Sequence, residues 1–241
     1  MTDRWKWRGM CAGLMIAAMI LSAPGALAAE KIVWLVRDLP PLAVHDGPYK
    51  DQGIIDQLLP VLIANMPQYE HVIQRVNRAR ALQVLEGPDL ACDPMLVWNP
   101  TRALSIVYSS PILGLRSNGL VIRRVDEPLI APFVHDQTVD LPAMLAAQSV
   151  KLGLVAKRSY GVWIDDQLSK SPANPLFTHY GNDAIGSLLQ MQHVGRLPAL
   201  LGYWPEIQSK AKQHGLSSKD LAFYPVEGAP AYQTIYAGSV S

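Results

Sequence analysis

The histidine, cysteine and paired acidic residues are the side chains of this sequence that could do chemistry, but their spacing supports little of it. The six histidines include no pair four residues apart, so a metal site on one helix face has no support. The two cysteines, Cys11 and Cys92, cannot build a disulfide framework or a cysteine-based zinc site. Asp165 and Asp166 are adjacent, which favours a solvated helix face. The sequence therefore predicts no metal site and no cofactor. The histidines are His45, His71, His135, His179, His193 and His214.

Sequence motifs for nucleotide binding and hydrolysis are also absent. The chain has no Gly-x-Gly-x-x-Gly, no Walker lysine, no Gly-x-Ser-x-Gly and no His-Glu-x-x-His. Its 21 Lys and Arg residues balance 20 Asp and Glu residues, so there is no basic surplus for nucleic acid. A hydrophobic content of 49% with 17% charged residues indicates a globular protein. The missing motifs make an enzyme less expected without excluding one, because active sites assemble from scattered residues.

The first 28 residues have the pattern of a secretory signal peptide. Three basic residues precede an apolar run over residues 10–21, and Ala26 and Ala28 provide the small residues before a cleavage point. The run is shorter than the roughly 20 residues that a membrane span needs, which disfavours an uncleaved anchor. Cleavage would leave Cys92 as the one thiol. We therefore expect an exported, periplasmic protein that is soluble once the signal is removed.

The rest of the chain alternates between strand and helix patterns, which predicts an α/β architecture. Predicted strands cover residues 31–36, 69–76, 90–98, 105–108, 119–125, 150–155, 197–203, 221–226 and 232–237. Predicted helices cover residues 54–66, 78–86, 160–168 and 182–194, with further helix starts at Asp140 and Pro205. Ser159 is the expected cap of the helix over residues 160–168. The stretch over residues 126–137 is expected to lead into a second lobe.

The order of several short motifs resembles the bacterial family 3 solute-binding proteins, which have the type II periplasmic binding fold and serve amino-acid ABC transporters. Asn99-Pro100-Thr101-Arg102 resembles the family's Thr-x-x-Arg turn, and Ser109-Ser110-Pro111 resembles its Phe-Ser-x-Pro. Residues 120–123 resemble the strand that crosses to the second lobe, and residues 152–161 resemble that lobe's first strand and the helix start after it. Residues 195–199 resemble a later Gly-Arg-Val-Asp-Ala. The resemblance covers about residues 31–239 and is to a divergent branch.

The resemblance implies two α/β lobes with mixed sheets flanked by helices. It places lobe 1 at residues 29–122, lobe 2 at residues 123–228 and a strand returning to lobe 1 at residues 229–241. In the family the chain ends with one or two helices on lobe 1. Here it stops soon after the return strand, so either those helices are dispensable or the C-terminal part of lobe 1 is truncated. Apolar surface exposed on that sheet would be the physical cost.

The resemblance also implies which residues hold a ligand between the lobes. A small anion is well held by a bidentate guanidinium and by free amides at a helix start. Arg102 occupies the place of the family's carboxylate clamp, and Ser159 and Tyr160, with the charge of Arg158, provide the second contact. Tyr203 stands where the family usually has an aspartate for the ligand's ammonium group, which argues against an ordinary α-amino acid. The implied ligand-binding residues are Arg102, Ser109, Arg158, Ser159, Tyr160, Tyr203 and Trp98.

Aromatic and basic residues near strand ends are further candidates for the ligand site. Trp34, Trp98 and Trp204 could stack on a flat or sugar-like ligand, although core packing is favoured for Trp34. Arg78 and Arg80 lie near the family's first-lobe binding loop, and solvent exposure is the favoured interpretation for both.

The favoured function is a monomeric periplasmic solute-binding protein that captures a small polar or anionic ligand for an ABC permease or a membrane sensor. One alternative is a periplasmic dehydratase or lyase on the same scaffold. It would need a general acid or base facing the cleft. Its available residues are Glu70, Glu86, His179 and Asp183. The other alternative is an accessory or signalling module that has lost ligand binding.

Overall fold

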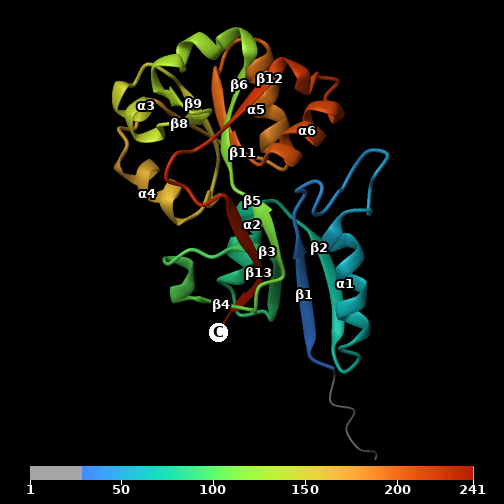
Figure 1. The fold of residues 1–241 in the computed structure, drawn as a ribbon. Coiled ribbons are helices and arrows are strands. Elements are labelled where there is room, and N and C mark those ends of the chain that lie inside the picture. Colours follow the sequence, from blue (N-terminus) through green and yellow to red (C-terminus); the bar gives the residue numbers. More distant parts are fainter. Residues whose placement is uncertain (1–28, 241) are drawn as a thin grey trace, which may run out of the picture.

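The computed structural model describes residues 29–240, which fold into two lobes, each built on its own β-sheet (Figure 1). The predicted signal peptide lies outside the described residues. Within the described range, no helix has both the length and the hydrophobicity to span a bilayer.

Lobe 1 contains a mixed sheet with the strand order β2-β1-β3-β13-β4, and β5 also pairs with β13. β1 is parallel to β2 and β3, whereas β13 is antiparallel to β3, β4 and β5. The helices α1 and α2 pack on opposite faces of this sheet. The elements of lobe 1 are β1 (Lys31–Val36), α1 (Ile54–Ala64), β2 (Glu70–Arg75), α2 (Arg78–Leu85), β3 (Ala91–Val97), β4 (Ile106–Tyr108), β5 (Leu113–Arg116) and β13 (Tyr232–Val240), with a 3-10 turn at Arg102–Leu104.

β1 forms the centre of lobe 1 because its apolar side chains are buried on both faces of the sheet. Ile32, Trp34 and Val36 pack in the cluster that includes α1. Val33 and Leu35 pack in the cluster that includes α2. Each such side chain contributes about 1.5–3 kcal/mol when fully buried. Trp34 is therefore a core residue, as favoured from the sequence.

The start of α1 fixes the loop that follows β1. Gly53 is the N-cap, and the Asp56 carboxylate accepts hydrogen bonds of 2.9 Å from the amides of Gly53 and Val44. The negative charge also suits the positive end of the helix dipole. α1 contains Pro60 and ends at Ala64, two residues before the predicted end. The loop after β1 is thereby held at the edge of lobe 1 that faces lobe 2.

Lobe 2 contains a mixed sheet with the strand order β10-β9-β11-β6-β12. β9 is parallel to β10 and β11, and β6 is antiparallel to β11 and β12. Its elements are β6 (Gly119–Arg123), α3 (Leu141–Ala147), β9 (Leu152–Val155), α4 (Val162–Lys170), β10 (Leu176–His179), α5 (Ala184–His193), β11 (Ala199–Gly202), α6 (Trp204–Gln213) and β12 (Leu221–Pro225). The stretch expected to lead into lobe 2 forms 3-10 helices at Arg124–Leu129 and Ala131–Phe133 and the hairpin of β7 (Val134–His135) and β8 (Thr138–Val139). A further 3-10 turn covers Ser218–Asp220.

The chain crosses between the lobes twice, between β5 and β6 and between β12 and β13. β6 already belongs to the second sheet, so the first crossing precedes the boundary expected at residues 122–123. Asn118, at the first crossing, is buried and donates to Gln233 at the start of β13 over 3.2 Å. Gln233 also accepts the hydroxyl of Tyr203 at 2.8 Å and donates to the carbonyl of Tyr160. A buried polar network thus joins both crossings to lobe 2.

The start of α4 differs from the prediction. Ser159 is not its N-cap. The N-cap is Gly161, whose φ of +100° is a conformation that favours glycine, and α4 begins at Val162. The carboxylate of Asp165, in the first turn, reaches back to accept the Ser159 hydroxyl at 2.5 Å and the Tyr160 amide at 2.7 Å. A side chain inside the helix therefore stabilises the loop before it, whereas a loop side chain, Ser159, was expected to cap the helix.

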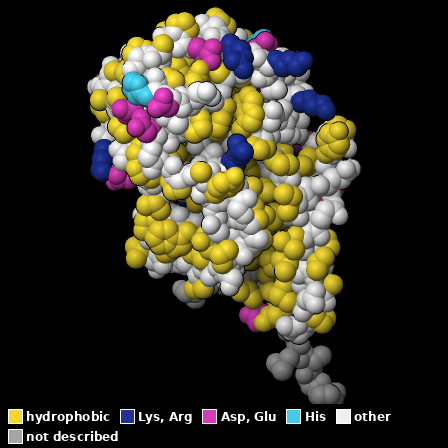
Figure 2. All heavy atoms as spheres, in the orientation of Figure 1, with side chains coloured by type: hydrophobic (Ala, Val, Ile, Leu, Met, Phe, Trp, Pro, Cys, Tyr) yellow, Lys and Arg dark blue, Asp and Glu magenta, His cyan; other side chains and the backbone are white. Residues whose placement is uncertain are grey.

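Hydrophobic side chains cover much of the visible face of lobe 1, whereas most charged side chains in this view lie on lobe 2 (Figure 2). Large exposed side chains of lobe 1 include Trp98, Leu104 and Val107, with exposed fractions of 41%, 87% and 56%. Val107 lies in β4, an edge strand of the first sheet, and Leu104 lies shortly before it. This edge of lobe 1 therefore carries apolar surface.

Candidate functional site

The two lobes face each other across a cleft and are in contact in this structure. Hydrogen bonds and an ion pair cross the cleft at five places. They join Asn77 to Asn182, Asn99 to Asp165, Arg102 to the Lys157 carbonyl, Asp38 to Lys210, and Gln213 to the Asp46 carbonyl. Those contacts come from loops after strands of lobe 1 and, in lobe 2, from residues at or before the starts of α4 and α5 and in the last turn of α6. The arrangement is a closed one, in which either lobe completes the polar surroundings of the other.

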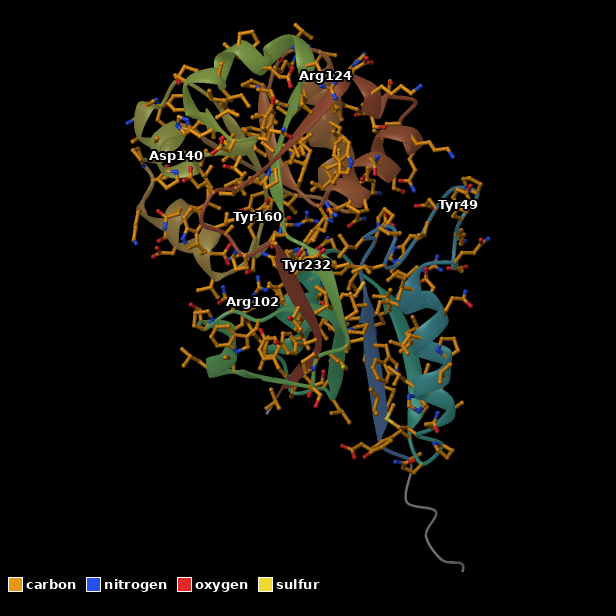
Figure 3. The ribbon with its side chains drawn as sticks, in the orientation of Figure 1. Tyr49, Arg102, Arg124, Asp140, Tyr160 and Tyr232 are labelled. Carbon is orange, nitrogen blue, oxygen red and sulfur yellow. The ribbon has the colours of Figure 1, made fainter. Side chains whose placement is uncertain are left out.

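Arg102 lies on the lobe 1 side of the cleft, directly below the region of Tyr160 (Figure 3). It begins the 3-10 turn after β3, and the Asn99 side chain holds that turn by accepting the Arg102 amide at 3.2 Å. Nη2 donates to the Lys157 carbonyl of lobe 2 at 2.6 Å. Nη1 is buried and has no hydrogen-bond partner among the described residues. Burial lowers the pKa of Arg102, and the nearby Arg37 lowers it further.

Arg78 is the first residue of α2 and lines a small inner cavity of about 30 Å³ between the lobes, together with Arg37 and Arg158. Asn77 caps the helix by accepting the Arg80 amide at 2.9 Å, which fixes where Arg78 projects. Burial and the charges of Arg37 and Arg158 hold the pKa of Arg78 well below its usual range. The prediction of solvent exposure is therefore wrong for Arg78. It is correct for Arg80, which is exposed.

The other two arginines of the cleft are held by carboxylates. Arg37, which follows β1, pairs with Asp93 of β3 at 2.7 Å, and both side chains are buried. Arg158 makes a bidentate pair with Glu206 of α6, at 2.7 and 2.8 Å. Burial alone would lower the pKa of Arg158, but the bond to Glu206 raises it above its usual value. Arg158 thus lies at the cleft, but both of its Nη atoms donate to a carboxylate of its own lobe.

The remaining predicted ligand residues are spread over different surroundings. Tyr160 is buried, its hydroxyl accepts the Val155 amide at 2.7 Å, and burial raises its pKa to about 12. Tyr203 is buried, and its hydroxyl donates to Gln233 in the buried polar network at the two crossings. Ser109 is exposed, and its hydroxyl accepts the Ala237 amide at 3.0 Å. Trp98 is exposed beside the turn of Arg102. The structure therefore brings Arg102, Arg158 and the loop before α4 to the cleft and places Ser109 against β13.

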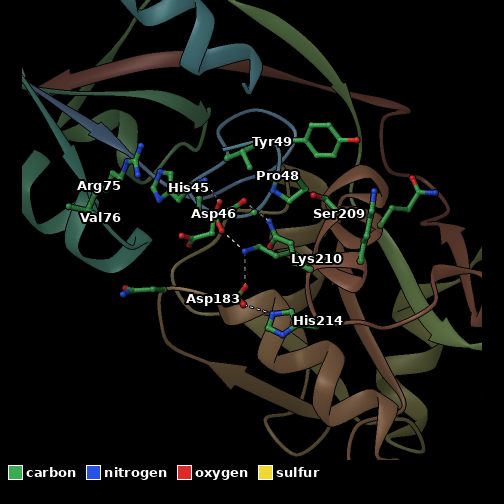
Figure 4. A pocket seen from close by; sticks show the side chains of 17 residues that line it. His45, Asp46, Pro48, Tyr49, Arg75, Val76, Asp183, Ser209, Lys210 and His214 are labelled. Atoms are coloured by element: carbon green, nitrogen blue, oxygen red, sulfur yellow. Dashed lines mark hydrogen bonds and ion pairs between the residues drawn. The ribbon is translucent and has the colours of Figure 1, made fainter. Parts of the chain in front are cut away.

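A larger cavity of about 1030 Å³ opens between the loop after β1 and helix α6 (Figure 4). Lys210 crosses its inner end, paired with Asp38 of lobe 1 and, at 3.0 Å, with Asp183 of lobe 2. Asp183 also pairs with His214 at 2.5 Å. Burial opposes these charges, but the bonds to Lys210 and His214 lower the pKa of Asp183, and those to Asp38 and Asp183 raise that of Lys210. Because Asp38, Asp183 and Lys210 line both cavities, this network connects the larger cavity with the small inner one.

No group of three His, Cys, Asp or Glu side chains within residues 29–240 could hold a metal ion. Of the acid–base candidates, Asp183 reaches the cleft, but both of its oxygens are engaged. Glu70 and Glu86 are exposed on lobe 1, and His179 ends β10.

The sequence interpretation missed Lys210, Asp38 and Arg37 as cleft residues. Asp38 and Arg37 carried a usable signal, because they directly follow the buried strand β1, and ligands of such sheets bind outside strand carboxyl ends. Lys210 carried no local signal, since it is one of several polar residues along α6.

No protein-family model matches the chain, and a search of curated proteins finds no match. Among solved structures, a histidine kinase sensor domain with similarity to periplasmic binding proteins matches with a TM-score of 0.66 at 13% identity, over 89% of this chain and 83% of that chain. Holo ArgBP from T. maritima matches with a TM-score of 0.59 at 14% identity, over 88% and 83%. The amino acid ABC transporter substrate-binding protein AbpA from Streptococcus pneumoniae, bound to L-arginine, matches with a TM-score of 0.60 at 14% identity, over 88% and 82%. These similarities confirm the predicted two-lobed, periplasmic-binding-protein-like fold.

Proposed function

We propose that the protein is a periplasmic solute-binding module that captures a small polar or anionic ligand between its two lobes. The observation that carries the proposal is Arg102, whose buried Nη1 has no partner in the described chain while its Nη2 already bridges to lobe 2. A buried donor without a partner costs free energy, about 1–3 kcal/mol or more for a charged group. A ligand oxygen would remove that cost.

Closure of the lobes would report ligand binding to a membrane partner. A ligand that touches both lobes stabilises the closed arrangement in proportion to its preference for that arrangement. The two crossings near Asn118 and Gln233 are the natural hinge, because no other covalent connection joins the lobes within residues 29–240. We propose an ABC permease or a membrane sensor as the partner, a monomeric state, and export directed by residues 1–28. The similar structures include both transporter binding proteins and a kinase sensor domain, which supports either partner. No covalent chemistry is required.

Isothermal titration calorimetry of the mature chain against amino acids, dicarboxylates and sugars tests the proposal. We expect at least one compound to bind, and Arg102→Ala to weaken that binding by about 10–100-fold, because a charge-assisted hydrogen bond contributes about 1.5–3 kcal/mol. Arg196→Ala is the matched control, since Arg196 is exposed on lobe 2 and lines neither cavity. Unchanged affinity in Arg102→Ala would contradict the assignment of Arg102. A flat titration with a folded protein would contradict ligand capture.

A further inference from the structure

The five carboxylates beside the inner cavity and the Arg102 turn, Asp38, Asp93, Asp165, Asp183 and Glu206, have no free oxygen to offer a ligand. Each of their ten oxygens accepts at least one hydrogen bond or ion pair from the protein itself. The donors are the His45 amide and Lys210 for Asp38; Arg37 and the Met95 amide for Asp93; Tyr160, Ser159 and Asn99 for Asp165; Lys210, the Gly186 amide and His214 for Asp183; and Arg158 for Glu206. A ligand ammonium group beside Arg78 and Arg102 would find no unpaired carboxylate to replace its water, since Asp46 lines only the larger cavity.

The donors of the cleft are in the opposite situation. The Arg78 guanidinium makes no ion pair or hydrogen bond with any residue of the described chain, although carboxylates hold Arg37 and Arg158 beside it. Arg102 has no carboxylate partner either, and its Nη1 is buried without any acceptor. Arginine remains charged at neutral pH even in such surroundings. Two guanidinium groups therefore lack a bonded carboxylate in a part of the cleft whose own carboxylates are all engaged.

We infer that the ligand is a small organic acid with two or more carboxylate groups and no ammonium group, held by Arg78 and Arg102. This inference rests on the proposed function and narrows its ligand class. Guanidinium groups bind carboxylates in a bidentate manner, and two unpaired ones match a dicarboxylate. An α-amino acid would have to leave its ammonium group without a charged acceptor, which disfavours it by desolvation.

The volume of the inner cavity adds a condition. About 30 Å³ holds one or two water molecules, so a dicarboxylate enters when the lobes part. Hydrogen bonds and an ion pair cross the cleft, and Tyr203, which packs in the lobe 1 core, lies beside the crossing strand at Gln233, an arrangement that suits such an opening. The ligand would then bring acceptors to the two guanidinium groups on the lobe 1 wall before lobe 2 closes on it.

Matched pairs of ligands that differ by one ammonium group test this inference. Calorimetric titrations would compare succinate with L-aspartate and glutarate with L-glutamate. We expect a dicarboxylate to bind at least tenfold more tightly than its amino-acid partner. Equal or tighter binding of L-aspartate, L-glutamate or L-arginine would overturn the inference and leave the proposed function standing, as would binding of a neutral sugar alone. No binding by any compound would contradict both.

Two variants of α2 make the test specific to Arg78. Arg78→Met should weaken dicarboxylate binding at least tenfold and raise the melting temperature of the ligand-free protein by a few degrees, because the repulsion between Arg78 and the charges of Arg37 and Arg158 is removed. Arg80→Met is the control, since Arg80 is exposed on the same helix and bonds Gln83. It should change neither quantity. Full affinity in Arg78→Met, or an equal loss in Arg80→Met, would overturn the role of Arg78.

Discussion

Two ion pairs of lobe 2 differ chiefly in burial, and that difference decides what each contributes. The Arg158 and Glu206 side chains are 4% and 3% exposed, whereas those of Lys170 and Asp166 are 66% and 46% exposed. Removing one partner of a buried pair leaves an uncompensated charge in a low-dielectric environment. Removing one partner of an exposed pair leaves a hydrated charge.

Arg158→Met should therefore lower the free energy of unfolding by about 3–5 kcal/mol. Lys170→Met, the exposed counterpart, should lower it by less than about 0.5 kcal/mol. Urea denaturation of both variants at neutral pH measures the difference. Similar losses in the two variants would show that the Arg158–Glu206 pair is not buried as described.

The imidazole of His45 should make the folding stability of the protein depend on pH. Its Nε2 is buried without a hydrogen-bond partner among the described residues, and burial lowers its pKa from the usual 6.5. The unfolded chain therefore binds a proton at this residue before the folded chain does. Folding stability from this group is complete above pH 6.5 and is lost as the pH falls below it.

Comparing the wild type with His45→Gln between about pH 7.5 and about pH 5 isolates this contribution. The wild type should lose stability more steeply on acidification than the variant, measured as urea midpoints at each pH. Parallel pH profiles would contradict the burial of the imidazole.

At the level of elements, the junction between β1 and α1 depends on the absence of a side chain at Gly53. A Cβ there would lie 2.3 Å from the carbonyl oxygen of Leu42, which is backbone and cannot rotate away. Gly114, in β5, has no atom within 4 Å of the same position. The two glycines therefore form a matched pair for substitution.

We expect Gly53→Ala to lower the free energy of unfolding by about 1–3 kcal/mol, because the loop after β1 must shift. Gly114→Ala should change it by less than about 1 kcal/mol. Thermal or urea unfolding of both variants tests this. A tolerated Gly53→Ala would mean that the loop is not packed against α1 as the structure shows.

Elements with strong local signals could be predicted from the sequence, and those that depend on distant partners could not. β1 has the expected bounds because residues 32–36 are apolar and buried on both faces, and α6 begins at Trp204, with Pro205 in its first turn. β5 was missed because its four residues become a strand only by pairing with β13, more than a hundred residues later. The cap of α4 was misassigned because Asp165, inside the helix, outcompetes Ser159.

The same distinction applies to the candidate site. Arg102 could be placed at the cleft because its turn follows a recognisable motif. Arg78 could not, since its half-buried position comes from the approach of lobe 2 and not from its own helix, where Arg80 remains exposed two residues later. Local polarity is identical at the two positions, so only the packing of the lobes separates them.

At the level of the whole molecule, the account depends on two lobes that close on one small ligand. The contacts that cross the cleft come from lobe 1 residues after β1, β2 and β3 and from lobe 2 residues before and in α4, before α5 and on α6. Any ligand that binds between these segments must change the surroundings of both lobes at once.

Amide proton–nitrogen NMR spectra of the mature chain, recorded with and without a mixture of small organic acids and amino acids, test this claim most directly. We predict that the mixture shifts the amide signals of Asn99, Thr101 and Arg102 in lobe 1 and of residues 157–160 in lobe 2 together, at the same ligand concentration. Shifts confined to one lobe, or an unchanged spectrum of the folded protein, would contradict the account.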